Sequence, residues 1–108
     1  MGKFEIKKSN DGEFHFDLKT SNGHVILSSN GYPQKVSCID TIRSIKKNAQ
    51  DDSRFDKVSN NGKYYFNIKS SNGKIIGRSE FYDNESSMCR GIESVKTNAL
   101  TAKVEDLT

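Results

Sequence analysis

Two stretches of the chain carry nearly the same residues fifty positions apart. The first is Gly12-Glu-Phe-His-Phe-Asp-Leu-Lys-Thr-Ser-Asn-Gly23, and the second is Gly62-Lys-Tyr-Tyr-Phe-Asn-Ile-Lys-Ser-Ser-Asn-Gly73. The similarity continues downstream, so that residues 12–49 align with residues 62–99 without a gap and are identical at 15 of 38 positions. A fixed repeat period defines the architecture of a protein. The sequence therefore predicts one structural unit built twice.

Chain length limits how these two units can be arranged. The chain has 108 residues, the length of one domain, and a single repeat of about half that length buries little surface by itself. We therefore expect a single domain over residues 1–108, in which repeat 1 (3–53) and repeat 2 (54–108) share one hydrophobic core. Because the two repeats supply both halves of a pseudo-dimer, we also expect a monomer.

The charge distribution gives a first candidate binding region. The net charge of +3 comes from 17 basic and 14 acidic residues, and the basic excess lies mainly in residues 35–49. Arg43, Lys46 and Lys47 form a basic patch on the helix predicted there. Such a helix face is usually only solvated, although a basic face can also bind nucleic acid or another polyanion.

Membrane, export and metal signals are missing from the sequence. The longest apolar run, Val25–Leu27, is far too short to cross a bilayer, and no signal-peptide core follows Met1. We therefore expect a cytoplasmic protein without membrane contact. Cys38 and Cys89 fall at inward positions of predicted helices, where cysteine acts as a small apolar residue, and a reducing compartment disfavours a disulfide. The spacing of Cys and His matches no zinc site, so we expect no metal and no cofactor.

Apolar residues that alternate with polar ones predict the strands. Phe14, Phe16 and Leu18 show this pattern, and the second repeat copies it. The pair Asn22-Gly23 predicts a type I′ hairpin turn, which needs positive φ at both residues. The strands predicted from this period and from the turn residues cover residues 4–8, 14–19, 24–29, 55–58, 64–69 and 74–79.

After these strands the apolar period changes to three or four residues, as an amphipathic helix requires. Asp83 or Asn84 can cap the start of the second helix, and Asn48 and Asn98 suit helix ends that leave through a left-handed residue. Gly91 lies inside the second helix at a cost of about 1 kcal/mol relative to alanine. A close approach of another group would explain this glycine, and so would the lack of any need for a larger residue. The predicted inward stripes are Val36, Ile39, Ile42, Ile45 and Ala49 in the first helix, and Met88, Cys89, Ile92, Val95 and Ala99 in the second.

Each predicted helix leads into a further strand. Residues 54–58 follow the first helix and also begin the second repeat, whereas residues 103–107 follow the second helix and have no third repeat to begin. An unpaired strand would expose an edge, which natural proteins avoid. We therefore expect residues 103–107 to pair with the sheet near the first repeat.

Two kinds of segment resemble a known family. Ile26-Leu-Ser-Ser-Asn-Gly-Tyr32 and Ile76-Gly-Arg-Ser-Glu-Phe-Tyr82 are similar to its I-x-x-S-E-x-Y signature, and Gly91-Ile-Glu-Ser-Val-Lys-Thr-Asn-Ala99 is similar to its GIESVKKNA helix. On these residues the chain is identified as a member of the YegP-like family, small bacterial proteins with a domain of unknown function in one or two copies. The resemblance covers essentially the whole chain, in the two-copy form.

The resemblance implies an architecture and no chemistry. It implies an α+β fold of two tandem β3-α-β repeats, which form one antiparallel sheet with the helices on one face and the C-terminal strands exchanged between repeats. Single-copy members would build the same object as homodimers. No catalytic residue can be transferred from the family. Thr41 replaces the helix glycine and Pro33 replaces a serine in the first repeat, so the two copies need not have equal roles.

The sheet face opposite the helices is the second candidate binding region. If Phe14, Phe16 and Leu18 point into the core, the residues that alternate with them point outward together. An exposed sheet face with aromatic and basic groups can stack bases and hold phosphates, although a merely solvated face has a similar pattern. The candidate residues on this face are His15, Lys19, Tyr65, Asn67 and Lys69.

The sequence carries no recognisable catalytic pattern. His15 and His24 titrate near neutrality when unperturbed, but their counterparts Tyr65 and Lys74 indicate that the fold needs no histidine at either place. No nucleophile elbow, phosphate loop or paired-acid arrangement occurs. The leading hypothesis is a non-enzymatic interaction or scaffolding module with a protein or peptide partner. Single-stranded nucleic-acid binding, and an enzyme site between the repeats, are the alternatives.

Overall fold

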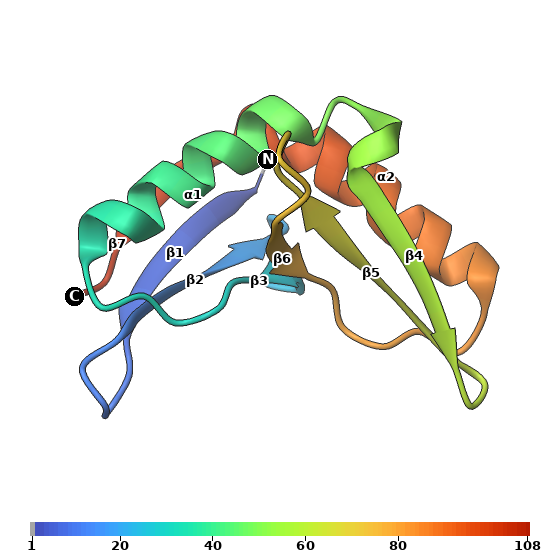
Figure 1. Ribbon diagram of the computed structural model, residues 1–108, viewed down its shortest axis with the longest axis horizontal. Helices are drawn as coiled ribbons and strands as arrows, with labels where there is room; N and C mark the ends of the chain where they lie inside the picture. The colour runs from blue at the N-terminus through green and yellow to red at the C-terminus, as the bar shows by residue number, and fades with distance from the viewer. Residues whose placement is uncertain (1) are drawn as a thin grey trace.

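The structure of the protein is a computed structural model that describes residues 2–108. Seven strands form one sheet, and two α-helices lie together on one of its faces (Figure 1). In chain order the elements are β1 (Lys3–Lys8), β2 (Phe14–Lys19), β3 (Val25–Ser28), α1 (Lys35–Asn48), a 3₁₀ turn (Asp52–Arg54), β4 (Phe55–Asn60), β5 (Lys63–Lys69), β6 (Ile75–Arg78), α2 (Glu85–Ala99) and β7 (Lys103–Asp106).

The strand order β4-β5-β6-β3-β2-β1-β7 places the two repeats side by side, with β3 and β6 at the junction. Within each repeat, neighbouring strands are antiparallel. At the junction only Ser28 and Arg78 are paired, and the two halves of the sheet splay apart beneath the helices (Figure 1).

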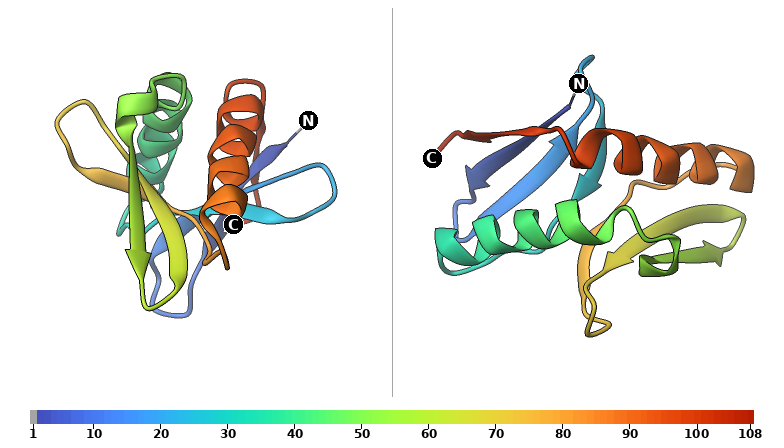
Figure 2. Two further views of the ribbon diagram at one scale, coloured as in Figure 1. Left: turned by 90° about the vertical axis from the view of Figure 1, so that its right-hand side faces the viewer. Right: turned by 90° about the horizontal axis from the view of Figure 1, so that it is seen from above.

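The strands that follow the helices cross between the repeats, as expected. The chain leaves α1 for β4, which pairs with β5 of the second repeat, and leaves α2 for β7, which lies beside β1 of the first repeat (Figure 2). Lys103 is aligned with Lys3, so β7 runs parallel to β1 and the sheet is not wholly antiparallel. The reason is that α2 brings the chain back to the end of the sheet where β1 begins, and the Lys103 N–H there lies 3.4 Å from the Gly2 carbonyl.

The helices connect the two halves of the core. They lie side by side and run in opposite directions (Figure 2). α1 packs against β2, β5 and β6, and α2 packs against β3 and β5, so each helix covers strands of both repeats. This packing favours one domain of two repeats with the bounds 3–53 and 54–108, which stays a prediction. The largest fully buried side chains are Phe4, Phe16, Phe66, Ile6, Leu18, Leu27, Ile42, Ile45, Ile68, Met88, Val95 and Cys38.

The hairpin turns are of two kinds. Between β4 and β5, Asn61 and Gly62 both have positive φ (52° and 77°), which is the geometry of a type I′ turn. At Asn22-Gly23 the type I′ prediction is wrong, because only Gly23 is left-handed (φ 85°). Here the Gly23 N–H donates to the Thr20 carbonyl (2.9 Å) and the Asn22 side chain accepts from a backbone N–H (3.3 Å). The loop is wider than predicted because the asparagine side chain holds it.

Helix ends follow the prediction at the start of α2 only. Asn84 caps that helix, since its Oδ1 accepts a hydrogen bond from the Ser87 N–H at 2.8 Å. The predicted left-handed exits at Asn48 and Asn98 are wrong. Both residues stay helical and donate from Nδ2 to the carbonyl four residues earlier, at 2.8 and 2.7 Å, which satisfies the amide inside the helix.

Two positions on the helices show how the core is packed. Val36 was predicted to point inward but is 57% exposed, because it lies in the first turn of α1, and Cys38 takes the buried place instead. Of the two explanations for Gly91, the structure supports a close neighbour. A Cβ there would lie 2.7 Å from Tyr82 Cζ and 3.2 Å from Phe66 Cε2. Glycine at this position therefore makes room for the Tyr82 ring.

Candidate binding surface

The sheet face opposite the helices carries the five candidate residues of the strands. Their alternation with core residues places them on the side away from α1 and α2. The face has two parts, which we call the first half (β1, β2 and β3) and the second half (β4, β5 and β6). His15 and Lys19 lie in the first half, and Tyr65, Asn67 and Lys69 lie in the second.

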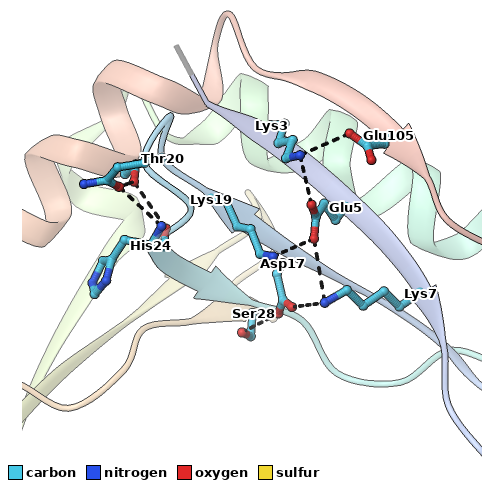
Figure 3. Close-up of polar contacts among 10 residues, drawn as sticks. Lys3, Glu5, Lys7, Asp17, Lys19, Thr20, His24, Ser28 and Glu105 are labelled. Carbon is cyan, nitrogen blue, oxygen red and sulfur yellow. Dashed lines mark hydrogen bonds and ion pairs between the residues drawn. The ribbon is translucent and has the colours of Figure 1, made fainter.

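In the first half the charged side chains neutralise one another. Glu5 lies at the centre, with its side chain only 8% exposed, and pairs with Lys19 (2.8 Å), Lys3 (3.1 Å) and Lys7 (3.7 Å) (Figure 3). Hydrogen bonds from Lys19 and then Lys3 lower the pKa of Glu5 to about 2. Lys7 also lies 3.7 Å from Asp17. Lys19, a predicted ligand contact, is therefore engaged within the protein.

The remaining polar groups of the first half are engaged as well. The Ser28 hydroxyl donates to Asp17 at 2.7 Å, and His15 Nδ1 lies 3.3 Å from the Ser9 hydroxyl. Lys3 reaches across to Glu105 on β7 at 3.2 Å (Figure 3). This half is thus a network of internal ion pairs and hydrogen bonds, which gives it a structural role.

In the second half, aromatic and apolar groups replace the ion pairs. The rings of Tyr65 and Phe81 meet edge to face, with centroids 5.4 Å apart. The Arg78 guanidinium carbon lies 5.6 Å from the Tyr65 centroid, and Val58 on β4 is the cross-strand neighbour of Tyr65. Phe81 is nevertheless 67% exposed. Val58, Tyr65, Arg78 and Phe81 together form what we call the aromatic patch.

Asn67 and Lys69 flank the aromatic patch and differ in what they can do. Asn67 is 4% exposed and accepts a hydrogen bond from Arg78 Nε at 3.3 Å, so it positions the guanidinium. Within residues 2–108 no carboxylate forms an ion pair with Arg78 or Lys69. Their charges are free to meet a ligand, in contrast to that of Lys19.

The first repeat has no equivalent of the aromatic patch. Gly31 stands at the position of Phe81, and the Glu13 side chain fills the space that a larger residue there would need, with its Cβ 3.3 Å from the place of the missing Cβ. Ser28 stands at the position of Arg78. Sequence reasoning missed Phe81 and Arg78 because it followed only the central strands. The Gly31/Phe81 and Ser28/Arg78 differences between the repeats were the available signal.

The predicted basic patch lies on the helix side of the sheet, away from this face (Figure 1). Lys46 donates to the Ala102 carbonyl at 2.7 Å and so helps to hold the chain that leads into β7. Arg43 is exposed and lies 3.6 Å from Asp40, and Lys47 is exposed. The two candidate regions therefore do not form one continuous surface.

A hollow of about 390 Å³ lies where the repeats meet on the open face. It is bordered by β3, β6 and the segments that follow them, including Ser28, Arg78 and Glu80. Glu80 forms a 2.6 Å pair with His24 of the first repeat. The side chains with the largest pKa shifts line no part of it. These are Glu5, Asp106, whose pKa is lowered by Lys35, and Cys38, whose pKa burial raises to about 11.

A metal-binding cluster and a membrane-spanning helix are both absent from residues 2–108. Residues 2–108 contain no group of three or more His, Cys, Asp or Glu side chains that could hold a metal ion. None of the helices in that range is long and apolar enough to span a membrane.

Both repeats of the chain match the same protein family. The sequence profile of one family, described as "Domain of unknown function (DUF1508)", matches twice, at residues 9–56 and 59–106. The chain belongs to this family. The two matches confirm the two-copy form. The resemblance to YegP is also confirmed, because UPF0339 proteins named YegP from Yersinia pestis and Escherichia coli are each 43% identical to this chain over 56 residues.

Other UPF0339 relatives match over a similar stretch. The protein from the ptx operon 5′ region of Stutzerimonas stutzeri is 48% identical over 56 residues, which are 52% of this chain and 50% of the relative. Each of these alignments thus spans about half the length of the curated relatives. No activity is stated in their names.

Two solved structures of the family have the same fold. The solution structure of YegP from E. coli, a protein of unknown function, is 42% identical and superposes with a TM-score of 0.93, covering 99% of this chain and 93% of the other. A UPF0339 protein from Shewanella oneidensis is 40% identical, with a TM-score of 0.94 and 92% of its chain covered. The α+β fold with tandem repeats is therefore that of the family.

Proposed function

We propose that the protein is a non-enzymatic interaction module, monomeric and cytoplasmic, which binds another protein through the aromatic patch. The observation that supports this is the exposure of Phe81, 67%, beside a Tyr65 ring that also stacks with Arg78. Aromatic and arginine side chains are enriched at the centres of protein interfaces. The first half of the same face, with its internal ion pairs, offers no such group.

Single-stranded nucleic acid is the second candidate ligand. Arg78 and Lys69 are cations without a carboxylate partner among residues 2–108, and Arg78 lies over the Tyr65 ring, which with Phe81 offers two rings to which bases could stack. The predicted basic patch on α1 lies on the other side of the sheet, so it would not contribute to the same strand of nucleic acid.

The test compares variants that convert the aromatic patch into its first-repeat counterpart. Phe81→Gly and Arg78→Ser introduce the residues of the first repeat, and His15→Ala is the matched control on the first half. Tagged full-length chains are used to recover partners from the native cell. We expect the two patch variants to lose the partner that wild type and His15→Ala retain. Equal recovery with all four proteins would refute the proposal.

Oligothymidine separates the two ligand classes. Addition to ¹⁵N-labelled protein at low salt should leave the Tyr65 and Arg78 signals in place if the ligand is a protein. Shifts of these signals that disappear at higher salt would instead favour nucleic acid, because phosphate contacts release counterions.

A further inference from the structure

The two borders of the sheet are not equivalent. At one border, β7 covers β1 in parallel, with Phe4 opposite Val104 and Ile6 opposite Asp106. At the other border β4 is the last strand, and no strand from residues 2–108 covers its outer edge. The first half of the sheet thus has an additional outer strand, β7, whereas the second half has no strand of residues 2–108 at the equivalent place.

β4 is the structural counterpart of β1. Phe55 pairs with Ile68 as Phe4 pairs with Leu18, and Lys57 pairs with Phe66 on the next core-facing position. In β1, the residues that bond to β7 are those whose side chains face the core, since the Leu107 N–H donates to the Ile6 carbonyl at 2.9 Å. By this correspondence the N–H and C=O groups of Lys57 point outward from the free edge. A fourth strand in the second repeat would find its ladder partners there.

A hollow beside β4 provides a place for a side chain of such a strand. It has a volume of about 290 Å³ and lies between β4 and α2, where Phe55, Cys89 and Ile92 form its apolar part. Lys57, Asp52 and Glu93 complete its lining, and both carboxylates are paired with Lys96, at 2.6 and 3.3 Å. These residues are the counterparts of Phe4, Ile39 and Ile42 of the first repeat. Val104 lies opposite Phe4, so the equivalent residue of an added strand would lie opposite Phe55, at this hollow.

The charge of Lys57 indicates which type of residue an added strand would carry two positions after its apolar residue. Lys57 occupies the position of Ile6, and it forms no ion pair within residues 2–108. On β7 the residue opposite Ile6 is Asp106. An acidic residue at the same place on an added strand would lie directly across from Lys57, and opposite charges on paired strands attract.

We propose that the outer edge of β4 is a docking site for an extended segment of a partner protein, which adds parallel to β4 with an apolar residue opposite Phe55 and an acidic residue opposite Lys57. The backbone ladder supplies affinity and the two side chains supply selectivity, as in other cases of strand addition. This site is separate from the aromatic patch and does not depend on it.

A second copy of this chain fits the edge poorly. Two β4 strands paired antiparallel about Lys57 would set that lysine against its own symmetry mate, and an inward charge on an edge strand is a known device against self-association. The β7 strand of a second copy is already held by Lys35–Asp106 (2.8 Å) and Lys3–Glu105 (3.2 Å). A segment from another protein has neither obstacle.

The probe for the test is a synthetic peptide of residues Thr101–Thr108, because it has Val and Asp at the required spacing. It is titrated into the ¹⁵N-labelled full chain. We expect shifts at Phe55–Ser59 and at Cys89 and Ile92. The same peptide with Asp106→Lys should bind about fivefold more weakly, and the protein variant Lys57→Glu should reverse this preference.

A second variant tests strand addition itself. Lys57→Pro removes an outward N–H while leaving the residues that bond to β5 in place, and proline is tolerated on edge strands. It should stay folded, by its β5 signals, and lose the peptide, whereas Phe81→Gly should bind it as wild type does. Unchanged binding by Lys57→Pro, shifts confined to β1 and β7, or no shifts at millimolar peptide would overturn the proposal. So would dimerisation of the free chain in light scattering that Lys57→Pro abolishes.

Discussion

The two halves of the open sheet face arose from one repeated unit and now differ in every respect that concerns binding. In the first half Glu5 gathers three lysines, Glu13 fills the space above Gly31, and β7 covers the edge. In the second half Phe81 is exposed beside Tyr65, and no strand among the described residues 2–108 covers the outer edge of β4. The two halves share the backbone of the family fold and differ in the side chains that they expose.

Under the two proposals above, this difference would give the repeats different roles. The first half satisfies its own charges and uses the last strand of the chain to close its border, so it stabilises the molecule. The second half leaves aromatic groups, cations and backbone donors exposed.

Separation of the repeats should have the largest effect. Residues 1–53 alone would lose β5 and β6, against which α1 packs, and the apolar face of that helix would lie in water. We expect this fragment to be unfolded at low micromolar concentration by circular dichroism and ¹⁵N NMR, whereas the full chain is folded. A well-dispersed spectrum from a monomeric fragment would show that the repeats are independent domains.

Exchange of the helix residues at the equivalent positions Gly91 and Thr41 should have the next largest effect. Gly91→Thr places a side chain in the space of the Tyr82 ring and should lower the free energy of unfolding by about 1–3 kcal/mol. The reverse change, Thr41→Gly, loses a hydrogen bond to the Ser37 carbonyl and some helix propensity, and should cost about 1 kcal/mol. Urea denaturation measures both. Equal losses of unfolding free energy in the two variants would contradict the expected difference between the two helix positions.

The smallest effect concerns the ion pairs of the first half. The pKa of Glu5 falls from its ordinary value of 4.5 to about 2, so its ionised form stabilises the fold above pH 4.5, and this contribution is lost as the pH falls toward 2. Glu5→Gln should lower stability at neutral pH by about 1 kcal/mol and flatten the acid dependence. Thermal unfolding between pH 2 and 7 measures this. The control is Asp56→Asn on β4, an exposed counterpart, and an equal change there would argue against the special role of Glu5.

Most of the fold could be predicted from local patterns, and the errors had local causes. The repeat, the strand period, the helices and the crossing of residues 103–107 all follow from the chain alone. The turn at Asn22-Gly23 and the helix ends at Asn48 and Asn98 were mispredicted because asparagine side chains bond to nearby backbone groups. These side-chain hydrogen bonds compete with left-handed backbone conformations, and the pattern of apolar residues gives no indication of them.

The candidate site was harder to predict than the fold. The alternation of residues along a strand shows on which face a side chain lies, but it does not show whether another residue of the protein already pairs with that side chain. Lys19 and Lys69 occupy equivalent positions, yet only Lys19 has a carboxylate at 2.8 Å, and that carboxylate comes from β1. Likewise, Tyr65 was predicted, but its partners Arg78 and Phe81 lie on other segments.

The amino-acid sequence by itself determined that this protein is a doubled α+β unit with a shared interior, because hydrophobic periodicity and turn residues act over short distances along the chain. Only the tertiary structure decided which copy is closed and which is open. β7 pairs in parallel with β1, Lys3 reaches Glu105 across 102 positions of the chain, and no strand within residues 2–108 covers the outer edge of β4. These features are fixed only when the sheet assembles, because they depend on residues far apart in the sequence.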